Sequence, residues 1–220
     1  MTVVVHNAEI DTGTGADPSV YTLGFTPTSG RSLLVAARSF NAPIAGLSDN
    51  QSNTWATDFE PTSGDVVFFR CQSIGTAPTT LSLDHDGTVF TYIVVLEVSG
   101  LASSPITRTQ DEEVITAPDA TTHNQDYTTD VDGSLVFGYF EDSGNTEYAG
   151  ASGTTVLVRD TAEARGGFYK VVTTAETGTI DFTSVDNKGP TATHVVYEPS
   201  VGGGGSVVPQ ARYYYNMQLS

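Results

Sequence analysis

The run from Val89 to Gly100, VFTYIVVLEVSG, is the sequence feature that most constrains the fold of this chain. It is the longest apolar run, and its β-branched and aromatic residues favour a strand. It is too short to span a bilayer as a helix, which needs about 20 apolar residues. We therefore expect a β-strand that is buried on both faces.

A weaker copy of this run appears about a hundred positions later, at Thr193–Ser200 (THVVYEPS). The aligned pairs, 101 positions apart, are Val94 and Val195, Val95 and Val196, and Glu97 and Glu198. A second match sets Ser32–Val35 against Ser134–Phe137 at a spacing of 102. The chain therefore contains two pseudo-repeats, about 25–100 and 127–200.

Helix signals are nearly absent, and short β-rich runs alternate with Gly, Thr, Ser and Pro, as in a sandwich or barrel. The expected strands are Val3–Ile10, Val20–Phe25, Ser32–Arg38, Thr54–Phe59, Val66–Gln72, Thr80–Asp84, Val89–Val98, Glu113–Thr116, Tyr127–Asp130, Leu135–Phe140, Thr155–Arg159, Gly167–Val172, Thr179–Thr183, His194–Glu198 and Arg212–Leu219.

The repeat fits either two tandem domains or two halves of one domain. No linker separates the copies, and neither half, with five or six expected strands, would readily close a sandwich alone. We therefore predict an all-β protein with one antiparallel, jelly-roll-like β-sandwich over residues 1–200, built from two pseudo-repeated halves.

The last twenty residues differ in composition from the rest. Residues 201–205 contain four consecutive glycines and read as a flexible hinge. Residues 206–220 read as a β arm whose alternating side chains would pair with a sheet edge, in the same or another subunit. The predicted interface residues of this arm are Tyr213, Tyr215, Met217 and Leu219.

The charge balance disfavours one class of partner. Twenty-six acidic residues against nine basic ones give a formal charge of −17, which repels nucleic acid. The single cysteine, Cys71, allows no intramolecular disulfide, and its apolar strand VVFFRCQ predicts a core residue. No secretion signal or membrane span is visible, so we expect synthesis in the cytoplasm.

No catalytic motif is present, and we predict no catalytic residue, no cofactor and no metal. Glu97 and Glu198 invite comparison with a glycosidase pair, but their neighbours do not form the E-x-D-x-E pattern of jelly-roll glucanases. We interpret both as strand-end carboxylates. The four histidines show no ligand spacing.

Two acidic turns, Asp84–Gly87 and Asp130–Gly133, share the pattern D-x-D-G. Clustered oxygens on a glycine-hinged loop suit Ca²⁺, but D-G is also an ordinary hairpin turn. We favour the turn. Trp55, after the polar loop 48–53, is the candidate glycan contact, with Phe59 nearby; the cluster Tyr213–Tyr215 is another aromatic candidate. For Trp55 we favour packing over the end of the sandwich core.

Several motifs resemble a known module. They are Gly30–Ala37 (GRSLLVAA), Leu47–Trp55 (LSDNQSNTW), Val94–Leu101 (VVLEVSGL) and Asp132–Gly138 (DGSLVFG). Together they resemble a β-sandwich module of tailed-phage virion proteins and bacterial surface proteins, with Ser52 where that pattern usually has Gly. The resemblance covers roughly residues 25–200 and brings no catalytic residues with it.

These observations predict a non-enzymatic structural protein of a virus particle: a capsid decoration (cement) protein or a fibre or tail component. The expected location is the virion, after synthesis in the host cytoplasm. The expected partners are further copies of the chain, as a trimer, and a capsid or tail protein, without nucleic acid or membrane. The alternative is a carbohydrate-binding, lectin-like module.

Overall fold

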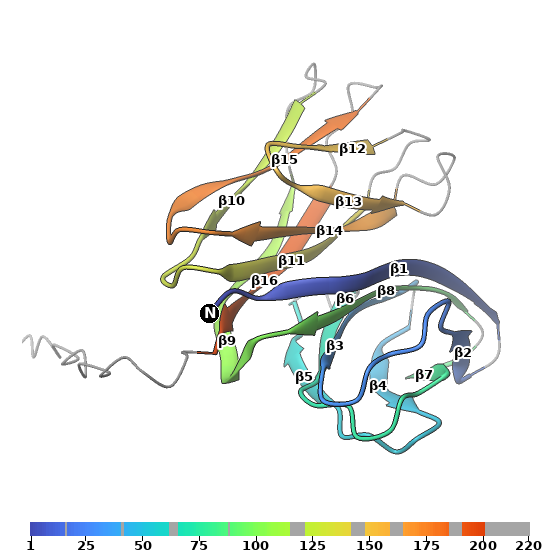
Figure 1. Cartoon of the computed structure of the whole chain (residues 1–220). Coiled ribbons are helices and arrows are strands. Elements are labelled where there is room, and N and C mark those ends of the chain that lie inside the picture. Colours follow the sequence, from blue (N-terminus) through green and yellow to red (C-terminus); the bar gives the residue numbers. More distant parts are fainter. Residues whose placement is uncertain are drawn as a thin grey trace, which may run out of the picture.

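The computed structural model describes residues 1–15, 17–40, 42–61, 66–87, 89–114, 122–141, 148–158, 165–184 and 191–200. Every regular element in these ranges is a β-strand, and all strand pairs are antiparallel (Figure 1). The predicted all-β antiparallel sandwich is therefore confirmed.

The N-terminal half has two sheets. A five-stranded sheet has the order β1-β8-β3-β6-β5, and a three-stranded sheet has the order β2-β7-β4. The strands are β1 (Val4–Gly15), β2 (Ser19–Thr22), β3 (Ser32–Ser39), β4 (Ile44–Asp49), β5 (Ala56–Phe59), β6 (Val66–Cys71), β7 (Thr80–His85) and β8 (Val89–Ser99).

The C-terminal half repeats this arrangement strand for strand. Its sheets have the orders β9-β16-β11-β14-β13 and β10-β15-β12, so each strand corresponds to the one eight places earlier. The strands are β9 (Leu101–Val114), β10 (Thr122–Thr128), β11 (Ser134–Glu141), β12 (Tyr148–Ala151), β13 (Thr155–Val158), β14 (Arg165–Val172), β15 (Thr177–Ser184) and β16 (Thr191–Pro199).

The register of the repeat corrects one detail of the sequence alignment. Leu34 pairs with Leu96 in the first half, and Leu135 pairs with Tyr197 in the second. Each residue of the second pair lies 101 positions after its counterpart in the first. The spacing of 102 that aligns Ser32–Val35 with Ser134–Phe137 is wrong. A slip of one residue moves every side chain to the opposite face of a strand. Both faces of β3 and β11 are buried and apolar, so the sequence pattern does not indicate which residues point to which face.

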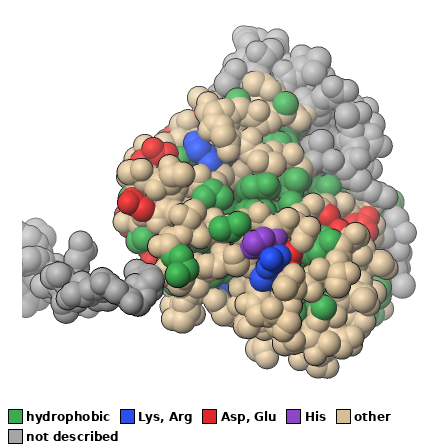
Figure 2. Space-filling model, viewed as in Figure 1, with side chains coloured by type: hydrophobic (Ala, Val, Ile, Leu, Met, Phe, Trp, Pro, Cys, Tyr) green, Lys and Arg blue, Asp and Glu red, His purple; other side chains and the backbone are tan. Residues whose placement is uncertain are grey.

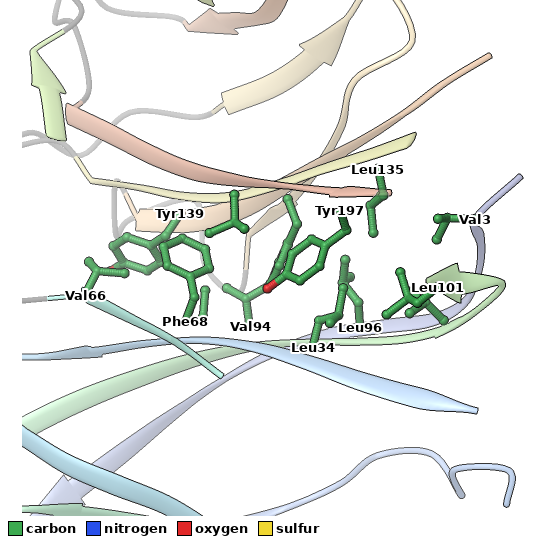
Figure 3. Packing of buried hydrophobic residues seen from close by; sticks show 14 of the residues in the cluster. Val3, Leu34, Val66, Phe68, Val94, Leu96, Leu101, Leu135, Tyr139 and Tyr197 are labelled. Carbon is green, nitrogen blue, oxygen red and sulfur yellow. The ribbon is translucent and has the colours of Figure 1, made fainter. Parts of the chain in front are cut away.

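The two halves form four layers, whereas the sequence predicted one sandwich that both halves complete. One apolar cluster lies between the two sheets of the N-terminal half, and another lies between those of the C-terminal half. A third joins the two five-stranded sheets face to face (Figure 3). Each half closes its own core because β4 and β12, which the sequence did not predict, contribute Ile44 and Leu47 to one core and Tyr148 to the other.

The run Val89–Gly100 contains β8, which is buried on both faces, as predicted. Along β8, Val94 and Leu96 point into the shared cluster, while Ile93 and Val95 point into the N-terminal core. A strand that serves two cores needs apolar side chains on both faces, which explains the unbroken run. Phe68 of β6 and Phe137 of β11 meet edge-to-face across the shared layer, with ring centroids 5.8 Å apart.

Most predicted strands coincide with observed ones. β4 and β12 escaped prediction because they are short and contain glycine. Most of β9, before Glu113, escaped because its residues are largely polar, as expected for an edge strand. The predicted strand Arg212–Leu219 lies outside the described residues.

The close approach of the two five-stranded sheets can be tested at Gly167 of β14. A Cβ added there would lie 2.4 Å from Cγ1 of Val94, so the sheets would have to separate. We expect Gly167→Ala to lower the free energy of unfolding by roughly 1–3 kcal/mol, measured by urea denaturation. Gly46→Ala is the matched control, because a Cβ on Gly46 meets nothing within 4 Å. Equal effects of the two substitutions would contradict this packing.

Candidate functional site

A buried carboxylate joins the two halves at β5. Asp58 receives hydrogen bonds from Nε of Arg70, at 3.0 Å, and from the hydroxyl of Tyr197 on β16, at 2.9 Å. Its side chain is only 1% exposed. Burial raises the pKa of Asp58, although the hydrogen bond and charge of Arg70 act to lower it. The carboxylate is therefore committed to a structural contact between the halves.

A second ion pair joins β3 to β11. Arg38 donates to Glu141 through Nε and Nη2, both at 2.9 Å, in a bidentate arrangement. The guanidinium of Arg38 also lies 4.7 Å from the ring centroid of Phe40, and that of Arg165 lies 4.4 Å from it. Such stacking adds to the attraction between an arginine and its surroundings.

Sequence reasoning missed this cluster because Arg38 and Glu141 are 103 residues apart. The available signal was Arg38 itself, a charged residue directly after the buried run Ser32–Ala37. A buried charge has to be paired, so such a residue predicts an unseen carboxylate partner.

Glu97 is fully buried at the end of β8. It accepts hydrogen bonds from the side-chain amide of Asn7, from the backbone N–H of Thr28 at 2.6 Å, and from Nη1 of Arg31 at 3.2 Å. Burial by itself would raise the pKa of Glu97, but these hydrogen bonds and the charge of Arg31 lower it below its ordinary value. The carboxylate is held ionised by the turn and strands around it.

Glu198 is not placed to cooperate with Glu97. Glu97 shares a face of β8 with Val95, which belongs to the N-terminal core, and Glu198 shares a face of β16 with Val196, which belongs to the C-terminal core. The two carboxylates therefore leave the shared layer in opposite directions. The pKa of Glu198 is raised, by burial and by the nearby charge of Asp130. This geometry lacks the facing pair that glycoside hydrolysis requires.

The two acidic turns serve as structural turns. In Asp84–Gly87, His85 points inward, and its Nε2 lies 2.9 Å from the hydroxyl of Ser19. In Asp130–Gly133, Gly133 has a φ of 82°, and its carbonyl accepts a hydrogen bond from N–H of Val3 at 2.9 Å. Within the ranges that the structure describes, no three His, Cys, Asp or Glu side chains gather where they could hold a metal ion.

Trp55 is tied to the loop that precedes it. Its indole N–H donates to Oδ2 of Asp49 at 2.9 Å, and its ring packs, partly buried, against the N-terminal core. Burial acts to raise the pKa of Asp49, but the hydrogen bonds from Trp55, Asn53 and Gln51 lower it.

Phe59 lies in the shared cluster, away from Trp55. It stacks on Phe68 there, because a register shift between Thr57 and Phe59 redirects its side chain. Trp55 and Phe59 do not form one platform.

The same loop contains a strained residue. Ser52 has a φ of 57°, in the left-handed region that glycine adopts most readily. The backbone here adopts a turn that a glycine would enter without this strain.

An open cleft of about 450 Å³ lies beside this loop, between it and the end of β6. Most of the residues that line it are polar, namely Ser52, Asn53, Thr54, Arg70, Gln72 and Ser73. The side-chain amide of Asn53 is already hydrogen-bonded to Thr76 and Gly75. That of Gln72 is hydrogen-bonded to Arg70 and Ala102. The hydroxyl groups are left as the natural contacts for a ligand.

The remaining titratable candidates are dispersed. Nε2 of His6 lies 2.8 Å from the hydroxyl of Ser99 at the surface, whereas His194 is buried on β16. Burial lowers the pKa of His194 to about 4. Cys71 is a buried core residue, as predicted, and burial raises the pKa of its thiol. The side chain of His123 lies outside the described residues.

The predicted interface residues of the arm, Tyr213, Tyr215, Met217 and Leu219, lie outside the described residues, as does the hinge 201–205. Their role stays a prediction from sequence.

No protein-family model, curated protein or solved structure matches this chain. None of the described segments is a helix long and apolar enough to cross a membrane.

The two glutamates offer a matched test of structural roles. We expect Glu97→Gln to lower the free energy of unfolding at pH 7 by roughly 1–3 kcal/mol, because an amide cannot replace an ionised acceptor of three hydrogen bonds. Glu198→Gln should change it by less than about 0.5 kcal/mol, because Glu198 has a raised pKa and lies near Asp130. Urea denaturation measures both.

The Glu97 effect should also depend on pH with a defined sign. Its pKa is lower in the folded protein than the ordinary 4.5, so its stabilisation is fully present above 4.5 and is lost as pH falls through the folded pKa. The difference between wild type and Glu97→Gln should shrink over that acidic window. A difference independent of pH would contradict this assignment.

Proposed function

We propose that this protein is a non-enzymatic structural or assembly protein of a virus particle, either a capsid decoration (cement) protein or a fibre or tail component. The observation that carries the proposal is that buried charged groups of this protein are engaged in structural contacts. Asp58, Glu97 and the pair Arg38 and Glu141 are each engaged in contacts that fix strands or join the two halves. Such groups stabilise a rigid body and are unavailable to a substrate.

Further support comes from sequence. The motifs around residues 30–37, 47–55, 94–101 and 132–138 resemble a module of tailed-phage virion and bacterial surface proteins. The left-handed Ser52 agrees with the turn that this module requires. The formal charge of −17 directs the proposal towards protein partners and away from nucleic acid. The partners proposed are other copies of the chain, as a trimer, and a capsid or tail protein.

Deletion of residues 202–220 tests the assembly role. We expect the truncated chain to lose oligomerisation and attachment to particles, because the arm is the segment predicted to add a strand to a neighbour. Light scattering after size-exclusion chromatography measures the mass, and circular dichroism checks that the strands still form. Assembly of the truncated chain to the full-length mass would contradict the proposal.

A carbohydrate-binding module is the alternative, favoured by the polar cleft beside the loop of Trp55. It predicts glycan-array binding that falls roughly two- to tenfold in Trp55→Ala, since stacking on an aromatic ring contributes on the order of 0.5–1.5 kcal/mol. Phe25→Ala is the control, because Phe25 also packs, partly buried, against the N-terminal core. Equal binding by wild type and Trp55→Ala would remove the alternative.

A further inference from the structure

Two edge strands run along one side of the junction between the halves. Within the described residues, β1 is hydrogen-bonded on one side only, to β8, and β13 is hydrogen-bonded only to β14. Figure 1 shows β1 crossing the front of the molecule below β13 and β14. Unpaired strand edges are ready acceptors for a further strand, and proteins usually protect or use them.

The surface between these strands is apolar. Its residues, which we call the seam surface, pack against the shared cluster and are only partly buried. They are Val5, Ala8 and Ile10 of β1, Leu157 of β13, and Tyr169 and Val171 of β14. Figure 2 shows hydrophobic side chains gathered in a band across the middle of this face. Contiguous apolar surface that stays partly open to solvent in this way is typical of an interaction site.

A bulge in β1 produces the seam surface. The register of β1 with β8 shifts between Val5 and Asn7, so Val5, Ala8 and Ile10 share one face although strict alternation would separate Val5 from the other two. Asn7 and Glu9 face the other way, where they bond to Glu97 and to N–H of Gly24. A strand added at the free edge of β1 would place alternate side chains over the seam surface.

The C-terminal arm has the length and pattern to be that strand. β1 has 12 residues, which span roughly 40 Å. The 15 residues of 206–220 are enough to cover it, and their alternation puts Tyr213, Tyr215, Met217 and Leu219 on one side. The arm carries one charged residue, Arg212, so its approach to a protein of formal charge −17 meets no like-charge repulsion.

The point where the chain leaves the fold decides which copy receives the arm. N–H of Ser200 donates to the carbonyl of Gly100 at 2.6 Å, and its hydroxyl lies 3.4 Å from the sulfur of Met1. The last described residue, Ser200, therefore lies beside the N-terminal end of β1. Antiparallel pairing with its own β1 would require residue 206 to begin at the far end, roughly 40 Å away, whereas the hinge spans at most about 20 Å.

All strand pairs in the described part of the chain are antiparallel, and antiparallel pairing is slightly the more stable kind. We propose that residues 206–220 of one copy add antiparallel to the free edge of β1 in a second copy. There Tyr213, Tyr215, Met217 and Leu219 cover the seam surface. The inference rests on the proposed assembly function and names the surface that the arm recognises.

Disulfide trapping between full-length chains tests the contact. One preparation carries Ala8→Cys, and a second, distinguishable by an added tag, carries Met217→Cys; parallel preparations carry the cysteine at Tyr213, Tyr215 or Leu219. Mild oxidation of the mixture should shift both chains to a heterodisulfide dimer on non-reducing electrophoresis. The native Cys71 is buried and should not compete. The matched control is Val20→Cys, since Val20 is 61% exposed on β2, away from the seam surface.

The outcomes separate the inference from the function on which it rests. Heterodisulfide with Ala8→Cys and not with Val20→Cys supports the seam surface as acceptor. Equal yields with both, in a protein whose oligomer still depends on the arm, would overturn the inference and leave the assembly role standing. A disulfide within one chain of the double variant Ala8→Cys, Met217→Cys would also overturn it. A full-length chain that stays monomeric would remove the assembly role itself.

Discussion

The apolar layer between the two five-stranded sheets is the contact on which the whole structure depends. It takes alternate side chains from β3, β6 and β8 of one half and from β11 and β16 of the other. Because these strands already bury their opposite faces against the smaller sheets, their sequences have to be apolar at nearly every position. The close approach of Gly167 to Val94 shows how little space the layer leaves.

Polar groups around this layer add specificity to it. Burial of an unpaired charge is costly, so the hydrogen bond of Tyr197 to Asp58 and the ion pair of Arg38 with Glu141 favour one placement of the halves. The N-terminus has a related role, because Val3 inserts into the shared cluster and its N–H bonds to Gly133 of the second half. A body joined in this way leaves the edge strands β1 and β13 paired on one side only within the described residues.

The fold class followed from the sequence because it rests on local patterns. The β-rich runs, the turn residues and the repeat of Val89–Gly100 at Thr193–Ser200 all survive as strands with matching positions. The number of layers did not follow, because strands such as β4 and β12 are too short to signal themselves. The site roles of Glu97 and Trp55 were partly predictable, since residues at strand ends and after polar turns usually bond to the turn. Their partners Asn7, Arg31 and Asp49 were not.

The sequence by itself determined that the chain is all-β, that it is duplicated, and that β8 is buried on both sides. These properties are written in residue types and in their spacing along the chain. Only the tertiary structure decided that each half closes its own sandwich, that the true repeat spacing is 101 throughout the central strands, and that a partly exposed seam surface lies along β1. The physical reason is that side-chain direction and sheet-to-sheet contact depend on pairing between strands far apart in the chain, where a shift of one residue exchanges one core for another.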